Sequence, residues 1–223
     1  MQLGARVRHV TVDGVRAEEQ SLGDLAVVEA ARNEPQHVEF ARREIARLVR
    51  DRAILLLGFA AALRRSELSA LDVADVVETA EGLRIVVGRS KTDQEGEGRT
   101  VGITYGANPP TCPVRAWRAW VQRSGIKDGP AFRRLSHGRL MPERISGDGI
   151  SRMVKRRAKA AGYAPELFSG HSLRSGFATT AARAGVAEHR IMRQGRWTTS
   201  QAMRGYIQQG ELFVDNPSAK LGL

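Results

Sequence analysis

The sequence is poor in cysteine: Cys112 is the only one among 223 residues. A lone cysteine excludes an intrachain disulfide and argues against a zinc site built from thiolates. Cys112 follows a proline-rich turn at residues 108–111, and no activating partner stands near it in the sequence. We therefore interpret it as a small structural residue rather than a catalytic thiol.

Long apolar runs are also missing. The best candidate, residues 53–63, is flanked by arginines and is shorter than the roughly 18 residues that a membrane-spanning helix needs. The N-terminus lacks the apolar segment of a signal peptide. Hydrophobic residues still make up 42% of the chain, which is typical of a globular fold rather than of disorder. We therefore predict a globular protein of the cytoplasm.

Acidic residues are outnumbered. The chain has 24 Asp and Glu against 35 Lys and Arg, which gives a net charge of +11. Most of the excess is arginine, whose planar guanidinium binds phosphate oxygens in pairs. This balance favours a polyanionic partner, above all nucleic acid. The alternative is an arginine-rich composition inherited from a GC-rich genome.

The hydrophobic pattern predicts a mainly α protein with a small antiparallel β-sheet, in the α+β class. Residues 1–48 carry little apolar material: a short strand at 7–15, a helix at 22–31 and a charged helix at 37–50. From residue 49 the pattern is denser. Strands at 83–87 and 100–103 flank a polar tip at 91–98, which predicts a β-hairpin with Lys91 near its end. Helices are predicted at residues 54–63, 113–123, 148–161, 172–184, 187–194 and 200–208.

Three groups of polar residues carry possible chemistry. Arg64 and Arg65 interrupt an apolar helix, where a charge needs an ion-pair partner such as Glu67 or a cleft to face. His171 and Arg174 stand three positions apart at a helix start, on one face and at the positive end of the helix dipole. That arrangement suits a phosphate anion.

Tyr206 is the third group. A tyrosine with a pKa near 10 is a poor nucleophile unless cations stabilise its oxyanion. Taken alone it is interpreted as a half-buried aromatic. Taken together, six residues stand in a distinctive order along the chain: Arg64, Lys91, His171, Arg174, Trp197 and Tyr206.

This order and spacing resemble the catalytic signature of the tyrosine recombinases, the phage integrase family. The sequence around Arg64, with Leu71 and Asp75 behind it, resembles the first arginine box of the family. Residues 90–93 resemble its lysine turn, and residues 169–174 its second box. Trp197 stands nine positions before Tyr206, preceded by Gly195 and Arg196, as in its third box. The resemblance covers residues 50–223.

The resemblance implies a mechanism. Tyr206 would attack a DNA phosphodiester, form a 3′-phosphotyrosine and release a 5′-hydroxyl, and a 5′-hydroxyl from another strand would reverse the step. Two rounds of exchange would pass through a Holliday junction. Neither ATP nor a metal is needed, so we expect no cofactor.

The implied roles follow the residue types. Arg64 and Arg174 would bind the two non-bridging oxygens, and Lys91 would protonate the leaving 5′-oxygen. His171 would assist proton transfer with Tyr206. Trp197 takes a position that is histidine in many relatives; it would donate its indole N–H to the phosphate and pack the site. Glu67 or Asp75 would orient Arg64, and we favour Glu67.

The expected partners are double-stranded DNA and other recombinase subunits in a DNA-assembled tetramer, which would place the protein at the nucleoid. The basic helix at 148–161 would lie along DNA, although a solvated helix face is an alternative for part of its charge. Its candidate DNA-binding residues are Arg152, Lys155, Arg156, Arg157 and Lys159.

The sequence departs from the family at its beginning. Members usually carry a separate helical domain that clamps DNA, and residues 1–48 do not resemble it. We interpret residues 1–48 as an arm or linker remnant, 49–210 as the catalytic domain and 211–223 as a docking tail. A fragment, a truncated mobile-element relic and a stand-alone protein that depends on partners all stay open. So do two other functions: a recombination-deficient DNA-binding protein, and type IB topoisomerase-like cleavage and religation.

Overall fold

The computed structural model describes residues 35–88, 99–211, 218 and 221. The chain divides into two compact units, Met1–Ile45 and Ala46–Leu223. The described part of the first unit is helical, and the second unit holds the fold discussed below. The predicted strand at 7–15 and helix at 22–31 lie outside the described residues.

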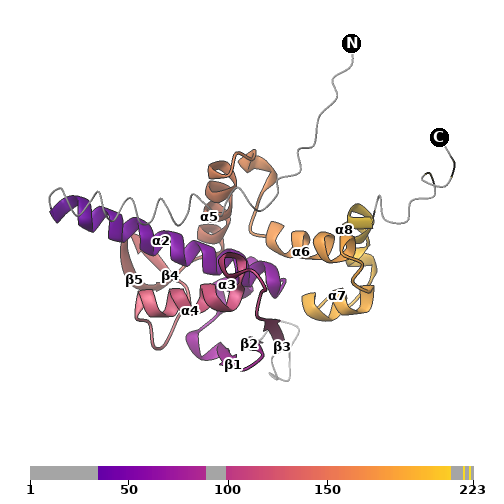
Figure 1. Cartoon of the computed structure of the whole chain (residues 1–223), viewed down its shortest axis with the longest axis horizontal. Coiled ribbons are helices and arrows are strands. Elements are labelled where there is room, and N and C mark those ends of the chain that lie inside the picture. Colours follow the sequence, from indigo (N-terminus) through magenta and orange to yellow (C-terminus); the bar gives the residue numbers. More distant parts are fainter. Residues whose placement is uncertain (1–34, 89–98, 212–217, 219–220, 222–223) are drawn as a thin grey trace, which may run out of the picture. The chain divides into compact units, whose positions relative to one another are not determined.

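The described elements are mainly helical, with two antiparallel sheets (Figure 1). In chain order they are α2 (Pro35–Ala60), α3 (Arg65–Ala70), η2 (Val73–Asp75), β1 (Val76–Thr79), β2 (Gly82–Val87), β3 (Arg99–Thr104), η3 (Pro109–Thr111), α4 (Pro113–Ser124), β4 (Arg133–Ser136), β5 (Arg139–Arg144), α5 (Gly147–Ala160), η4 (Pro165–Leu167), α6 (Ser172–Arg183), α7 (Glu188–Gly195) and α8 (Gln201–Glu211). The α+β class predicted from the sequence is confirmed. None of the described helices is long and apolar enough to span a membrane.

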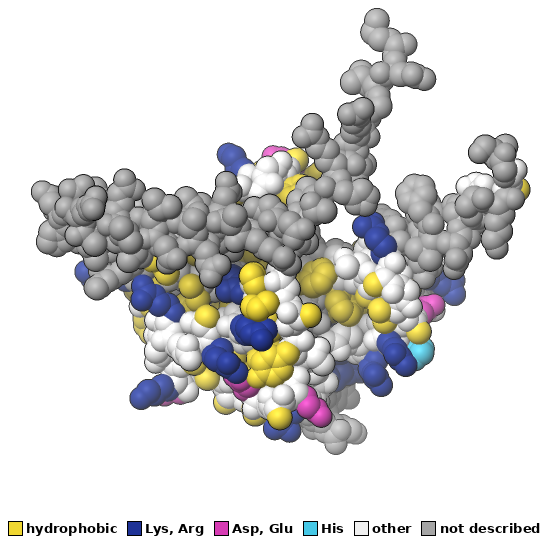
Figure 2. Space-filling model, viewed as in Figure 1, with side chains coloured by type: hydrophobic (Ala, Val, Ile, Leu, Met, Phe, Trp, Pro, Cys, Tyr) yellow, Lys and Arg dark blue, Asp and Glu magenta, His cyan; other side chains and the backbone are white. Residues whose placement is uncertain are grey.

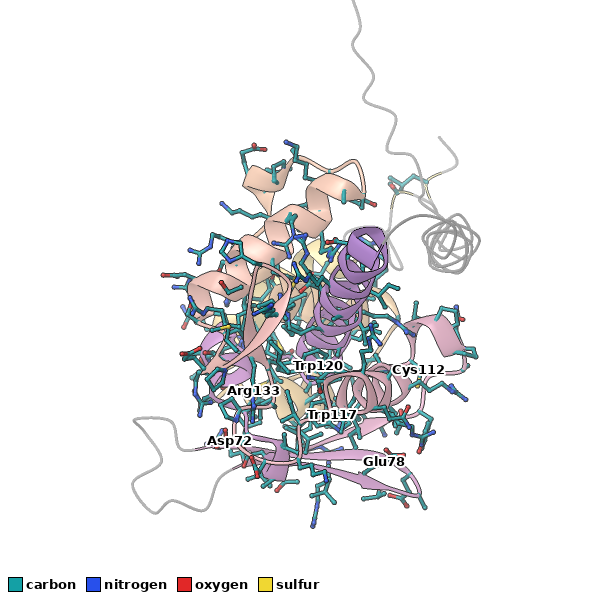
Figure 3. All side chains as sticks on the ribbon, turned by 90° about the vertical axis from the view of Figure 1, so that its left-hand side faces the viewer. Asp72, Glu78, Cys112, Trp117, Trp120 and Arg133 are labelled. Atoms are coloured by element: carbon teal, nitrogen blue, oxygen red, sulfur yellow. The ribbon has the colours of Figure 1, made fainter. Side chains whose placement is uncertain are left out.

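The larger hydrophobic core joins α2, α3, α4 and α5 with the sheets. Trp117 and Trp120 reach into it from α4 (Figure 3) and pack on the ring of Phe132. The indole N–H of Trp120 donates to the carbonyl of Ala131 at 2.8 Å, so its one polar atom is satisfied. Cys112 is buried in this core, in the structural position predicted for it.

A smaller core holds the C-terminal helices together. Ala178 of α6, Ile191 of α7, and Met203 and Ile207 of α8 are buried against one another. Small residues on α6 let α8 approach it closely, so residues 171–174 and Tyr206 are carried on one packed unit.

The three-stranded sheet has the order β1-β2-β3, with Ile85 paired to Val76 on one side and Val101 on the other. These three residues are buried and anchor the sheet to the core. The hairpin of β2 and β3 was predicted; its tip, residues 89–98 with Lys91, lies outside the described residues.

The second sheet corrects the prediction of a single one. Strands β4 and β5 form a two-stranded hairpin in a region without alternating hydrophobicity. The strands are joined by a two-residue turn at His137 and Gly138, which both have the positive φ that such a turn requires. The glycine of this turn is the cue that the sequence offers. Strands are predicted mainly from alternating hydrophobic and polar residues, and these charged strands lack that alternation.

Candidate active site

The site begins where α2 ends. The helix stops at Ala60, three residues earlier than predicted, and Ala62 takes a left-handed conformation with φ of 47°. This turn releases Arg64 from the helix into an extended conformation at the N-cap of α3. Arg64 therefore stands beside the core rather than inside it, with 47% of its side chain exposed.

Glu67 holds Arg64 by two hydrogen bonds. The Arg64 guanidinium donates to Oε1 at 2.6 Å, and its backbone N–H donates to Oε2 at 2.7 Å. Burial by itself raises the pKa of Glu67, but the Arg64 backbone hydrogen bond and the charge of Arg196 outweigh it and hold that pKa below its usual range. Glu67 is therefore an anion that fixes Arg64.

The other candidate carboxylate, Asp75, has a local task. It accepts a hydrogen bond from the Asp72 backbone N–H at 2.9 Å and so closes the η2 turn. Arg65, the competitor of Arg64, turns to α5, where it donates to Asp148 at 3.2 Å and Ser151 at 3.3 Å. Glu67 therefore pairs with Arg64, while Asp75 and Arg65 have other partners.

Arg174 is a buried cation of the site, 2% exposed on α6. Its Nη1 donates to the carbonyl of Ala62 at 2.8 Å, and its guanidinium carbon lies 4.0 Å from the ring centroid of Trp197. Burial, followed by the positive charge of Arg64, lowers the pKa of Arg174 to about 10, so it is still a cation at neutral pH. Within the part of the chain that the structure describes, its buried Nη2 has no hydrogen-bond partner. A buried donor without an acceptor is costly, and an oxyanion would satisfy it.

His171 and Tyr206 face each other. Nε2 of His171, just before α6, lies 2.9 Å from the hydroxyl of Tyr206 on α8. Burial lowers the pKa of His171, and the positive charges of Arg174 and Arg64 lower it further, so the ring is neutral at pH 7. With its proton on Nδ1, Nε2 is free to accept the tyrosine proton.

The turn after α7 seats Trp197 against Arg174. A Cβ added to Gly195 would lie 1.8 Å from Cζ3 of Trp197, so only glycine leaves room for the indole. Arg196 between them has a positive φ of 58° and is buried. The sequence motif contained this residue, but its spacing gave no signal that its side chain turns inward.

Gln194 connects this turn to the β2–β3 hairpin. Its side-chain amide donates to the carbonyl of Ala60 at 2.9 Å and to that of Gly102 on β3 at 2.9 Å. The strand that leads back from residues 89–98 is therefore fixed to the end of α7. The geometry of Lys91 itself lies outside the described residues.

The five candidate cations of α5 divide into two sets. Arg156 and Arg157 bind Asp51 of α2, at 2.8 Å each, and Arg50 binds the same carboxylate at 2.8 Å. Asp51 is 1% exposed, so these ion pairs dock α5 on α2. The three remaining cations of the set are exposed: Arg152, Lys155 and Lys159. Figure 2 shows Lys and Arg side chains spread over one face of the molecule, with scattered acidic side chains between them.

Comparison with known proteins identifies the family of the chain. Residues 33–211 match the model of the phage integrase family. An integrase/recombinase xerD homolog of Selenomonas ruminantium is 39% identical over 169 residues, 75% of this chain and 50% of the relative. Recombinase cre of Escherichia phage P1 is 28% identical over 175 residues, 72% of this chain and 49% of the relative. The chain thus spans about half the length of both relatives.

Solved structures share the fold. The XerH site-specific recombinase bound to palindromic difH substrate, in its post-cleavage complex, superposes with a TM-score of 0.62 at 15% identity, over 82% of this chain and 51% of that chain. The XerA recombinase superposes with a TM-score of 0.55 at 22% identity, over 76% of this chain and 56% of that chain.

Proposed function

The chain belongs to the phage integrase family, and on this premise we propose that it cleaves and rejoins DNA through a 3′-phosphotyrosyl intermediate on Tyr206. The observation that carries the proposal is the buried Nη2 of Arg174, which finds no acceptor among the described residues. It lies in the same site as Arg64 and a histidine–tyrosine pair. A DNA phosphate would supply the missing acceptor.

Arg64 and Arg174 would bind the phosphate. Arg174, buried, would donate through Nη2 to one non-bridging oxygen, and the half-exposed Arg64 would donate to the other. Both charges would then lie where the extra negative charge of a pentacoordinate transition state develops. Trp197 stacks on Arg174 and would donate its indole N–H to the same phosphate.

Proton transfer completes the step. The hydroxyl of Tyr206 gives its proton to Nε2 of neutral His171, and its oxygen forms a bond with phosphorus. The bond from phosphorus to the 5′-oxygen breaks, and Lys91 gives that oxygen a proton. The resulting phosphotyrosine keeps the bond energy, so an incoming 5′-hydroxyl reverses the step without ATP.

Double-stranded DNA is the proposed substrate. Exposed Arg152, Lys155 and Lys159 on α5 would contact its backbone, and each phosphate contact adds to a salt-dependent affinity. Arg156 and Arg157 would contribute less, because they already bind Asp51.

We also propose the larger organisation. Residues 49–210 form the catalytic domain, and residues 211–223 dock on a neighbouring subunit in a tetramer assembled on DNA at the nucleoid. Deleting residues 211–223 tests the docking. We expect loss of DNA-dependent multimers, while multimerisation and strand exchange at wild-type levels would refute it.

A nicked suicide substrate tests the chemistry. A nick just beyond the cleaved bond lets the short 5′-hydroxyl strand diffuse away, so the covalent protein–DNA adduct accumulates. We expect an adduct with the wild-type protein and none with Tyr206→Phe, while Tyr163→Phe, a change in an exposed tyrosine, behaves as wild type. An adduct without strand exchange would favour topoisomerase-like cleavage, and DNA binding without any adduct would favour a binding-only protein.

A further inference from the structure

Arg196 is a buried cation to which the proposed mechanism gives no task. It caps the C-terminus of α7, is 8% exposed and has a φ of 58°, in the left-handed region that side chains other than glycine rarely adopt. Such a conformation is kept when the surrounding contacts require it.

The contacts of Arg196 join three segments of the site. Its Nη1 donates to the carbonyl of Ala61 at 3.1 Å and to that of Gln194 at 3.0 Å. Its Nη2 donates to Glu67 Oε2 at 2.8 Å and to the carbonyl of Ala62 at 3.4 Å. One guanidinium therefore ties the end of α7 to the turn after α2 and to the carboxylate of α3.

This carboxylate is the one that holds Arg64. Glu67 receives Arg64 on Oε1 and Arg196 on Oε2, and only 11% of its side chain is exposed. Without Arg196, Glu67 and Arg64 would form a neutral ion pair, because the carboxylate would balance the charge of Arg64. With Arg196 the group keeps a net charge of about one proton beside the phosphate site, where burial limits screening.

The hydrogen bonds of Arg196 to backbone carbonyls also help to position Arg64. The carbonyl of Ala62 accepts from Arg174 as well as from Arg196, at the left-handed residue that turns the chain toward Arg64. Losing Arg196 would leave the turn held from one side only.

We propose that Arg196 is a positioning residue: acting through Glu67 and the turn at Ala61 and Ala62, it holds the Arg64 guanidinium in place and leaves its charge available to the scissile phosphate. The inference rests on the proposed function, since it names what prepares Arg64 for that reaction.

The test uses Arg196→Met, which removes the charge at similar length, and Arg196→Lys, which keeps the charge but loses the fork. Arg193→Met, in an exposed arginine of the same helix, is the matched control. At saturating nicked DNA we expect Arg196→Met to slow adduct formation about a hundredfold, the cost of a misplaced catalytic group. Arg196→Met should weaken DNA binding by no more than about tenfold, and Arg196→Lys should recover part of the rate. Arg193→Met should change both the rate and the DNA affinity by less than about twofold.

A double-mutant cycle separates positioning from general stability. In an Arg64→Lys background, adding Arg196→Met should slow the reaction by no more than about twofold further, because its effect passes through Arg64. The same hundredfold loss in both backgrounds would overturn the proposal, as would a loss that follows the melting temperature and leaves the rate of the folded fraction unchanged.

Inorganic phosphate provides a readout that needs no catalysis. In a ³¹P NMR titration we expect Arg196→Met to weaken phosphate binding about tenfold, and Arg193→Met to leave it unchanged. Wild-type protein that binds phosphate but forms no adduct would refute the proposed function, and the titration would still decide the role of Arg196. Unchanged phosphate affinity in Arg196→Met overturns the positioning role, and wild-type protein that neither binds phosphate nor forms an adduct overturns both.

Discussion

Trp197 offers a prediction whose size follows from the structure. Its ring lies 4.0 Å from the guanidinium carbon of Arg174, a cation that is 2% exposed. A desolvated cation–π contact contributes about 2 kcal/mol. At about 1.4 kcal/mol for each factor of ten, its loss slows the reaction roughly thirtyfold.

Two substitutions separate stacking from hydrogen bonding. Trp197→Phe removes the indole N–H and keeps an aromatic face over Arg174, while Trp197→Ala removes both. We expect the alanine variant to form the covalent adduct at least about tenfold more slowly than the phenylalanine variant, because benzene gives a weaker contact than indole but keeps most of it. The assay is the single-turnover rate of adduct formation on nicked DNA, with thermal unfolding as the control for folding.

The refuting result is equally specific. Equal rates for Trp197→Phe and Trp197→Ala would mean that the face of the ring does nothing for Arg174. Trp197 would then act only as a donor to the phosphate, a role whose loss costs about a hundredfold or more.

Three further predictions concern the site and its support. Burial and the charges of Arg174 and Arg64 hold the pKa of His171 below its usual value of about 6.5, and only the neutral ring accepts the tyrosine proton. The rate of adduct formation should therefore stay level through neutral pH and fall only in the acid range below that value. A rate that already falls between pH 8 and 7 would contradict this. Asp51→Asn leaves three arginines without their shared anion and should lower the free energy of unfolding by about 3–5 kcal/mol in a denaturant titration, whereas a loss under about 1 kcal/mol would refute the ion-pair account. Lys155→Gln should weaken DNA binding and reduce the salt dependence of log Kd by about one, more than Arg156→Gln does, and the reverse order would contradict the division of α5.

The sequence predicted the parts of the site that are written in short motifs. Arg64, His171 and Tyr206 stand in local patterns, and the structure brings them together with Arg174 and Trp197. The sequence also predicts the helices that carry Arg174 and Tyr206, at residues 172–184 and 200–208.

What escaped prediction depends on distant pairs. Arg196 meets Glu67 across 129 positions, and Arg157 meets Asp51 across 106. Neither pairing has a local cue, so neither can be predicted from the sequence. The β4–β5 hairpin was missed for a different reason: its strands are too charged to alternate, and only His137 and Gly138 mark its turn.

Identifying the residue that carries the DNA tests the proposed chemistry directly. The chain has three tyrosines, Tyr105, Tyr163 and Tyr206. The adduct formed on nicked DNA is digested with nuclease and trypsin, and the nucleotide-bearing peptide is sequenced by mass spectrometry. We expect a 3′-phosphonucleotide on Tyr206 alone. A nucleotide on Tyr105, Tyr163 or any other residue would contradict it.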